Sequence, residues 1–234
     1  MKLDIIYRCC NAEVDTRQLR DIRPPWFDKI NCLRAFLDSV ERHKEYVNRL
    51  IFLYDGPKGR LYDNIPLEYE TVCIDHQDNE KSLMESFEIA DTLKENIYFI
   101  EDDYMHLAQS IKTIALGVQN FKLVTGYDHL DRYRRGDDIT LGKDYVAFSN
   151  KTNCHWRTCE STCCTWATTQ NDWKEIMAPM ARSYKLNDRE LFRNIYVEYS
   201  LRLWNPIPAV TTQVDHALAP GIDWKAVNDT WKDK

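Results

Sequence analysis

The sequence is poor in glycine and lacks any long hydrophobic run, and each absence excludes classes of protein. Only 7 of its 234 residues are glycine, and neither G-x-x-x-x-G-K-[ST] nor G-x-G-x-x-G occurs. This argues against phosphate-loop kinases and GTPases and against hydride-transfer enzymes. No apolar run approaches the length of a membrane span, and the N-terminus has no secretory pattern. We therefore expect a protein that is made and kept in the cytoplasm.

Positive charge is not in excess either. The formal net charge is −6, which argues against a protein that binds nucleic acid by neutralising its phosphates. We find no internal repeat and no low-complexity tract. A chain of this length can build one α/β domain of good size with its own core.

The eight cysteines need an interpretation of their own. Cys9–Cys10 and Cys163–Cys164 are adjacent pairs, and adjacent cysteines rarely bridge each other. Cys154, His155 and Cys159 add to a local cluster, but the spacing matches no common zinc pattern. We interpret the cysteines as reduced thiols that act as small apolar residues, with a metal site as the alternative.

Strands and helices alternate along the first half of the chain. Apolar, strand-forming runs predict strands at 3–7, 50–54, 69–74 and 97–100. Helical spacing of apolar residues predicts helices at 28–47, at about 82–93 and from about 107 to 118. This alternation is typical of βαβ units and of a mostly parallel sheet.

The second half has a different character. Short strands are expected at 123–125, 146–148 and 165–168, with a polar surface loop at 127–143. One helix is expected at 171–180, and another begins near 187–188 and includes Leu203. The proline-containing tail from 205 to 224 is expected to wrap over the body with little regular structure.

The strand at 97–100 runs directly into Glu101, Asp102 and Asp103. Three carboxylates at the end of a buried strand cannot all be buried without partners. The carboxyl ends of strands in an open α/β sheet are also where ligands bind. Hard oxygen ligands suit Mg²⁺ or Mn²⁺, which in turn suits a phosphate-bearing ligand. The alternative is a solvated acidic turn.

Other polar residues follow the neighbouring predicted strands. Tyr7 and Arg8 leave the first strand, Asp55 leaves the second, and Asn79 and Lys81 follow the third. A cation near a diphosphate and an acid near a base or ribose are what a nucleotide site needs. Lys81 precedes a predicted helix, whose free N–H groups also attract anions. Its alternative role is that of a solvated lysine at a helix start.

The chain resembles nucleotide-sugar-dependent glycosyltransferases of the GT-A fold. The residues that carry the resemblance are Tyr98 to Asp103, which match the D-x-D motif, and Asn79 to Ser82, which match an Asn/Lys segment. It is most similar to small, inverting, family-2-like enzymes, including those of large algal viruses and phages. The resemblance implies a Rossmann-like α/β fold with a mixed, mostly parallel central sheet flanked by helices.

The same resemblance implies one GT-A domain over 1–234. Residues 1–122 would form the nucleotide-sugar-binding half, 123–204 the acceptor-side half and 205–234 a C-terminal tail. Asp103 would hold Mn²⁺ or Mg²⁺, which bridges the two phosphates of a donor such as a UDP-sugar. The residues expected to bind the donor are Tyr7, Arg8, Asp55, Asn79, Lys81 and Asp102.

An inverting transfer needs a general base that takes the proton of the acceptor hydroxyl. Similar enzymes use an acid that opens a helix downstream of the metal motif, and Asp188 has that position. Asp188 could equally be an acid that stabilises the helix start. Glu160, between two predicted strands, is the second candidate, and Glu190 is the third.

Candidate acceptor residues and a further metal ligand lie in the second half. Trp156 could stack on a sugar and Arg157 could bind its oxygens, although a tryptophan that packs on the sheet is the alternative. His216 is a candidate third metal ligand because some GT-A enzymes use a C-terminal histidine, with Asp215 as the alternative.

The expected activity is metal-dependent transfer of a sugar from a nucleoside-diphosphate donor to a hydroxyl of a glycan, with inversion. The protein is expected to act in the cytoplasm, or in the host cytoplasm if the chain is virus-encoded. One rival is a sugar-1-phosphate nucleotidyltransferase, but the segment after the first strand contains no glycine. Another is a glycan- or nucleotide-binding module without catalytic activity.

Overall fold

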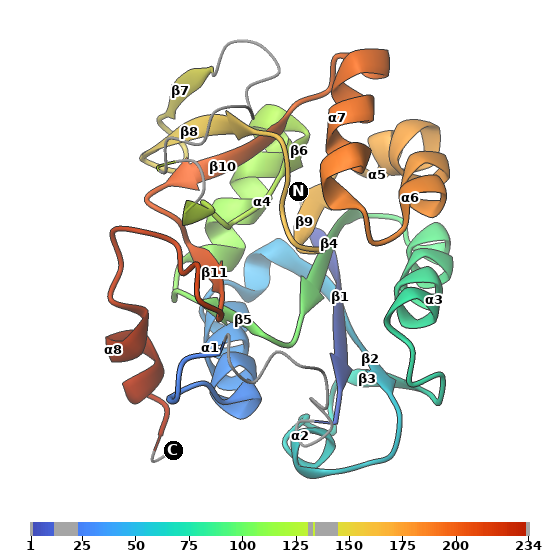
Figure 1. Cartoon of the computed structure of the whole chain (residues 1–234), viewed down its shortest axis with the longest axis vertical. Coiled ribbons are helices and arrows are strands. Elements are labelled where there is room, and N and C mark those ends of the chain that lie inside the picture. The colour runs from blue at the N-terminus through green and yellow to red at the C-terminus, as the bar shows by residue number, and fades with distance from the viewer. Residues whose placement is uncertain (1, 12–22, 131–132, 134–144, 233–234) are drawn as a thin grey trace.

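The computed structural model describes residues 2–11, 23–130, 133 and 145–232 and shows a nine-stranded mixed sheet flanked by helices (Figure 1). The strand order is β3-β2-β1-β4-β9-β6-β10-β8-β7, and β11 and β5 form a separate two-stranded sheet. This confirms the predicted fold class. The predicted loop at 127–143 lies for the most part outside the described residues.

The elements have the following bounds. The strands are β1 (Leu3–Cys10), β2 (Val47–Asp55), β3 (Glu70–Ile74), β4 (Asn96–Glu101), β5 (Tyr104–His106), β6 (Leu123–Val124), β7 (Val146–Ser149), β8 (Cys154–Cys159), β9 (Trp166–Thr168), β10 (Leu203–Ile207) and β11 (Thr211–Gln213). The helices are α1 (Lys29–Arg42), η1 (Lys44–Tyr46), α2 (Arg60–Asp63), α3 (Asn79–Thr92), α4 (Ser110–Phe121), α5 (Gln170–Asp172), η3 (Trp173–Met177), α6 (Ala178–Tyr184), α7 (Asp188–Tyr199) and α8 (Trp224–Asp229).

The N-terminal part of the sheet is parallel. Strands β3, β2, β1 and β4 pair in parallel, so their carboxyl ends lie at one edge. Strand β9 is antiparallel to β4 and to β6, while β10 pairs in parallel with β6 and antiparallel with β8. The chain order reverses at β1, with β2 on one side and β4 on the other, and such a switch point is where open α/β sheets bind ligands.

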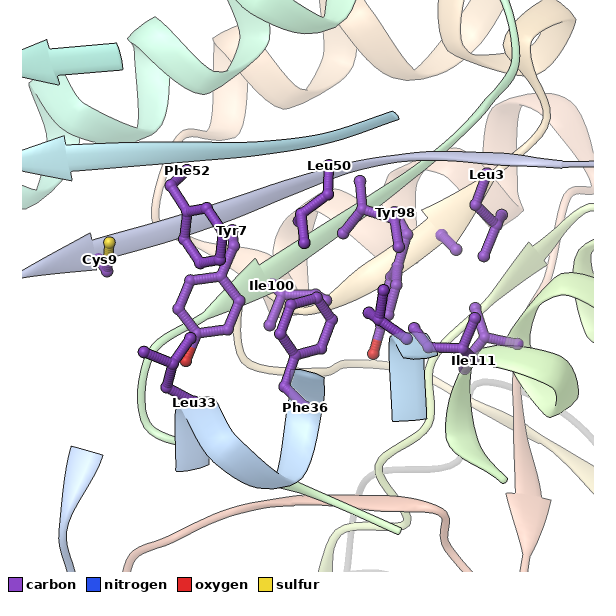
Figure 2. Close-up of a cluster of buried hydrophobic side chains, with 14 of the residues drawn as sticks. Leu3, Tyr7, Cys9, Leu33, Phe36, Leu50, Phe52, Tyr98, Ile100 and Ile111 are labelled. Atoms are coloured by element: carbon purple, nitrogen blue, oxygen red, sulfur yellow. The ribbon is translucent and has the colours of Figure 1, made fainter. Parts of the chain in front are cut away.

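Helices α1 and α4 cover one face of the sheet. Tyr7 points to this face and packs with Phe36 and Phe52, at 4.9 and 5.2 Å between ring centroids (Figure 2). The alternating side-chain direction of a strand places Ile6 in the cluster on the other face. There α3, α6 and α7 pack on the sheet around Phe99 and Trp173, whose rings are 5.2 Å apart.

Several predicted helix boundaries differ from those in the structure. The helix expected at 28–47 ends at Arg42, and Val47 instead begins β2. Helix α3 begins at Asn79 rather than at 82, because the Asp78 side chain caps it by accepting the N–H of Lys81 at 2.9 Å. Helix α7 ends at Tyr199, so Leu203 belongs to a strand.

The expectation of a tail with little regular structure is also wrong, and a further strand lies between those expected at 146–148 and 165–168. Cys154–Cys159 is strand β8, and β10, β11 and α8 lie in the tail region. Strand β10 lies inside the sheet although it contains Pro206, which lacks an N–H. Its pairing with β6 is confined to Trp204 and Val124, so Pro206 lies beyond the part that β6 covers. Among the described residues, none of the helices has the length and apolar character that crossing a membrane requires.

Candidate functional site

A cleft of about 390 Å³ opens at the carboxyl ends of β1, β2 and β4. Acids outnumber cations among the described residues that line it. The acids are Asp55, Asp78, Glu101, Asp102 and Asp103, and the cations are Arg8, Arg23 and Lys29. The convergence predicted for the strand ends therefore holds for Arg8, Asp55, Asn79 and the acid triplet, all of which line the cleft.

Glu101 and Asp102 each lie against a cation. Glu101 forms an ion pair with Arg8, its neighbour in the register of β1 and β4. Asp102 Oδ2 lies 3.0 Å from Lys29 Nζ and accepts the Cys10 N–H at 2.9 Å. Burial raises the pKa of Glu101 to about 8 although the Arg8 charge opposes this. Burial disfavours the charge on Lys29, but Asp102 and Cys10 together outweigh burial, so the pKa of Lys29 is raised.

Asp103 has one oxygen with partners and one without. Its Oδ2 lies 2.7 Å from Arg23 Nη2 and accepts a hydrogen bond from Gln213 Nε2 at 3.1 Å. Its Oδ1 is buried and has no hydrogen-bond partner among the described residues. Buried carboxylate oxygens normally have hydrogen-bond partners. Oδ1 is therefore an oxygen that is available as a ligand to a cation. Among the three acids of the triplet, Asp103 therefore has the oxygen that is most available to bind a cation.

The donor set fits a divalent cation that also takes ligands from a substrate. In the described part of the chain, no group of three or more histidine, cysteine or acidic side chains is arranged to hold a metal by itself. Mg²⁺ is usually held by one or two carboxylates together with substrate phosphates rather than by an all-protein cage. Asp102 and Asp103, adjacent in the cleft wall, supply that number of carboxylates.

Asp55 shapes the loop that leads to α3. Its Oδ1 accepts the N–H groups of His76 and Gln77 at 2.7 and 2.9 Å, and its Oδ2 accepts that of Asp78 at 3.4 Å. Three backbone donors around one carboxylate fix the loop where it borders the cleft. The following Asn79 accepts hydrogen bonds from Arg8 through its side chain and through its carbonyl, the latter at 3.2 Å.

Asp188 opens α7 and lies close to the acid triplet in space. Its Oδ2 accepts the Cys164 N–H at 2.6 Å. Burial raises the pKa of Asp188 to about 7, while the hydrogen bonds from Cys164 and the Arg8 charge work in the opposite direction. Asp188 also contributes to the raised pKa of Glu101. The helix cap itself is Asn187, whose side chain accepts the Glu190 N–H, so Asp188 is not the N-cap.

Two residues expected at the donor site lie elsewhere. Tyr7 is fully buried beneath the sheet against α1, because side chains alternate along β1 and its neighbour Arg8 takes the cleft side. Figure 2 shows the Tyr7 ring pointing toward Leu33. Lys81 lies exposed in the first turn of α3 and does not line the cleft. The donor-binding roles expected of Tyr7 and Lys81 therefore do not fit these positions.

The acceptor-side expectations change as well. Trp156 is fully buried and packs against Phe121, with 5.1 Å between ring centroids, so its ring cannot stack on a sugar. Arg157 is tied to Asp128 by an ion pair of 2.5 Å and lies over the Tyr133 ring. Neither residue lines the cleft. The alternative in which the tryptophan packs against the sheet is the one that the structure supports.

Asp188 does not line the cleft, and the remaining candidates lie outside it as well. His216 follows the tail segment that contacts Asp103, but its side chain is 63% exposed and its Nδ1 lies 4.0 Å from Asp215. Glu160 directly follows β8 and is half-buried. Glu190 contacts Arg193 and Asn194 of its own helix. None of the three lines the cleft.

Sequence reasoning missed Arg23, Lys29 and Gln213. Lys29 carried one usable signal, since a lysine in the first turn of a helix opposes the helix dipole unless an acid compensates for it. Arg23 precedes two prolines without any periodic pattern, and Gln213 belongs to a tail that was expected to be irregular. Neither carried a signal in the sequence.

Comparisons with known proteins show the fold and no more. No known family and no curated protein matches the sequence. Among solved structures, glucosyl-3-phosphoglycerate synthase from Mycobacterium tuberculosis, in complex with Mn²⁺, UDP and phosphoglyceric acid, is 14% identical with a TM-score of 0.50. That match covers 86% of this chain and 66% of the other. A putative nucleotide-diphospho-sugar transferase from Desulfovibrio desulfuricans G20 is 10% identical, with a TM-score of 0.48 and coverage of 88% and 80%. The chain therefore has an α/β fold that is also found in a synthase solved with Mn²⁺ and UDP.

Proposed function

We propose that the chain is a metal-dependent glycosyltransferase that moves a sugar from a nucleoside-diphosphate donor to a hydroxyl of a glycan. The observation that carries the proposal is the buried Oδ1 of Asp103, which has no hydrogen-bond partner among the described residues and lies beside Asp102 in a cleft at the switch point of the sheet. This is the place where an open α/β sheet binds a nucleotide, and these oxygens are the donors that Mn²⁺ or Mg²⁺ prefers.

The charge of the cleft supports the need for a divalent cation. Among the described residues, five acids and three cations line it before any ligand enters, and a nucleoside diphosphate would add further negative charge. Asp102 and Asp103 would hold the cation, and the solved structure of the synthase with Mn²⁺ and UDP supports the same ligand class here. When bound, the cation would neutralise the charge that develops on the diphosphate as the sugar bond breaks.

The chain's own residues would bind the donor around that point. Arg8 and Lys29 line the cleft and keep their positive charge, so they would attract the diphosphate in addition to the cation. Asp55 would act by holding the loop in front of α3, where Asn79 borders the cleft. UDP is the nucleotide that the resemblance favours.

Asp188 would be the general base of an inverting transfer. A carboxylate with a pKa of about 7 is partly ionised at neutral pH and accepts a proton more readily than an ordinary aspartate. Asp188 does not line the cleft, but it is close enough to Arg8 and Glu101 to interact with both charges, and Cys164 fixes its orientation. It would take the proton of the acceptor hydroxyl as the new bond to the sugar forms.

The test is calorimetric titration of UDP, GDP and dTDP with Mn²⁺ or with EDTA. Wild-type protein should bind one of the three nucleotides in the presence of Mn²⁺ and should not bind it in EDTA. Asp103→Asn should lose the Mn²⁺-dependent nucleotide binding. Asp38→Asn, which removes a surface acid paired with Arg42 on α1, is the matched control and should bind as wild type does. Nucleotide binding with the same affinity in EDTA as in Mn²⁺ would overturn the metal mechanism. Formation of pyrophosphate from a nucleoside triphosphate and a sugar-1-phosphate would indicate a nucleotidyltransferase instead.

A further inference from the structure

Arg23 joins the acid triplet to the tail of the chain. Its Nη2 lies 2.7 Å from Asp103 Oδ2, and its Nη1 donates a hydrogen bond to the Val214 carbonyl at 2.6 Å. The guanidinium also lies 4.7 Å from the centroid of the Phe27 ring. The side chains of Arg23 and Asp103 are only 14% and 9% exposed, so water screens their charges weakly.

The two oxygens of Asp103 therefore differ in kind. Oδ2 receives hydrogen bonds from Arg23 and from Gln213, whereas Oδ1 is buried with no partner among the described residues. A cation at Oδ1 would share one carboxylate group with the Arg23 guanidinium. Two positive charges on one buried carboxylate repel each other, so either the cation binds weakly or the guanidinium moves away.

We propose that Arg23 is the internal counter-ion of Asp103 and limits how tightly the site holds a divalent cation. The proposal rests on the proposed function in that Asp103 is taken as the metal ligand. Without Arg23 the buried carboxylate would have no charge partner among the described residues, so Arg23 stabilises the metal-free protein. With a cation present, Arg23 competes with it. Arg23 can leave Asp103 and still keep the Val214 carbonyl and the Phe27 ring, both of which are uncharged.

The deciding variant is Arg23→Gln, which removes the charge and keeps a polar side chain. Mn²⁺ is titrated without nucleotide and followed by calorimetry or by the electron paramagnetic resonance of the free ion. Arg23→Gln should bind Mn²⁺ about tenfold more tightly than wild type, within the usual range of coupling between two bound groups. Its metal-free Tm should fall, and the rise in Tm caused by Mn²⁺ should grow because the ligand binds only the native state.

Two matched variants separate charge from other effects. Arg49→Gln removes a surface guanidinium that pairs with Glu70 and should leave the Kd for Mn²⁺ unchanged. Gln213→Leu removes the uncharged donor to the same oxygen, and it should not tighten Mn²⁺ binding. An unchanged or larger Kd in Arg23→Gln would overturn the proposal, since Arg23 would then either have no effect on the cation or help to hold it.

Wild-type protein provides a test that does not depend on a variant's folding. If Mn²⁺ displaces Arg23, phenylglyoxal should modify Arg23 several times faster in Mn²⁺, as followed by peptide mapping, while modification of Arg49 should stay constant. An unchanged rate at Arg23 would contradict displacement. Should Arg23→Gln bind Mn²⁺ more tightly while no form binds a nucleotide, the proposed function fails and this inference stands. If UDP binding requires Mn²⁺ but Arg23→Gln leaves the Kd for Mn²⁺ unchanged, this inference fails and the proposed function stands.

Discussion

Lys29 Nζ lies 3.0 Å from Asp102 Oδ2, and this ion pair joins the first turn of α1 to the turn after β4. The two side chains are only 6% and 10% exposed. Lys29 Nζ also lies 3.2 Å from the Cys10 sulfur, and the Cys10 N–H donates to the same Asp102 oxygen. The floor of the cleft is therefore one connected polar network that joins β1, β4 and α1.

Replacing Lys29 by methionine should destabilise the protein by about 3 kcal/mol, because the buried Asp102 carboxylate would lose its charge partner. The measurement is urea unfolding at pH 7. Arg42→Met, which breaks the solvent-exposed pair with Asp38, is the control and should leave the midpoint unchanged. Equal stabilities of Lys29→Met and wild type would contradict a structural role for the buried pair.

The raised pKa of Asp188 should appear in the pH dependence of transfer. Only ionised Asp188 can accept a proton, so kcat should fall about tenfold per pH unit below about 7 and level off above it. Asp188→Asn should lower kcat by about 10²- to 10⁴-fold and leave UDP affinity unchanged. The pH–rate profile and UDP calorimetry check both parts. Normal turnover by Asp188→Asn would refute its assignment as the base, and Glu160→Gln would then be the next variant to measure.

The same variant should change stability in a pH-dependent direction. The pKa of Asp188 is raised from 3.8 to about 7 in the folded protein, so stability is lost as pH rises through this window and the carboxyl ionises. The amide side chain of the Asp188→Asn variant does not ionise. We therefore expect this variant to be more stable than wild type by about 1 to 2 kcal/mol at pH 8, allowing for partial solvent exposure, and equally stable near pH 4. Thermal unfolding at both pH values tests this, and equal Tm values at pH 8 would contradict the raised pKa.

Gly117 allows α4 to approach β8 closely. A Cβ at this position would lie 2.3 Å from Cη2 of the fully buried Trp156 ring. Gly117→Ala should therefore destabilise the protein by about 2 kcal/mol, although alanine favours a helix by about 1 kcal/mol. Denaturant unfolding gives the value. In a Trp156→Leu background the same change should be much less harmful, and an equal effect in both backgrounds would show that the ring is not the cause.

Local sequence information was sufficient for the parts of the site that lie at strand ends. The run from Ile97 to Ile100 predicts a buried strand, and the triplet Glu101, Asp102 and Asp103 must then lie at its carboxyl end. Arg8, Asp55 and Asn79 were found by the same argument. The same argument also predicted Tyr7, which lies on the opposite face, because strand alternation places adjacent residues on opposite faces and the sequence does not show which face binds the ligand.

The counter-ions of the triplet could not be predicted in this way. Lys29 is 73 residues from Asp102, and Arg23 and Gln213 are 80 and 110 residues from Asp103. No spacing rule relates residues so far apart, since only packing brings them together. The tail was misjudged for the same reason, because β10 is short, contains a proline and becomes a strand only through its partners β6 and β8.

Short-range periodicity and the energy of a buried charge were enough to predict the α/β alternation, the buried strand β4 and the requirement that three consecutive acids find partners. The identity of those partners depends on the packing of the folded chain. Packing placed Arg8, Lys29 and Arg23 against the triplet, left Asp103 Oδ1 without a partner in the described part of the chain and buried Trp156 in the core. These outcomes depend on contacts between distant segments, which form when the sheet and its helices pack together.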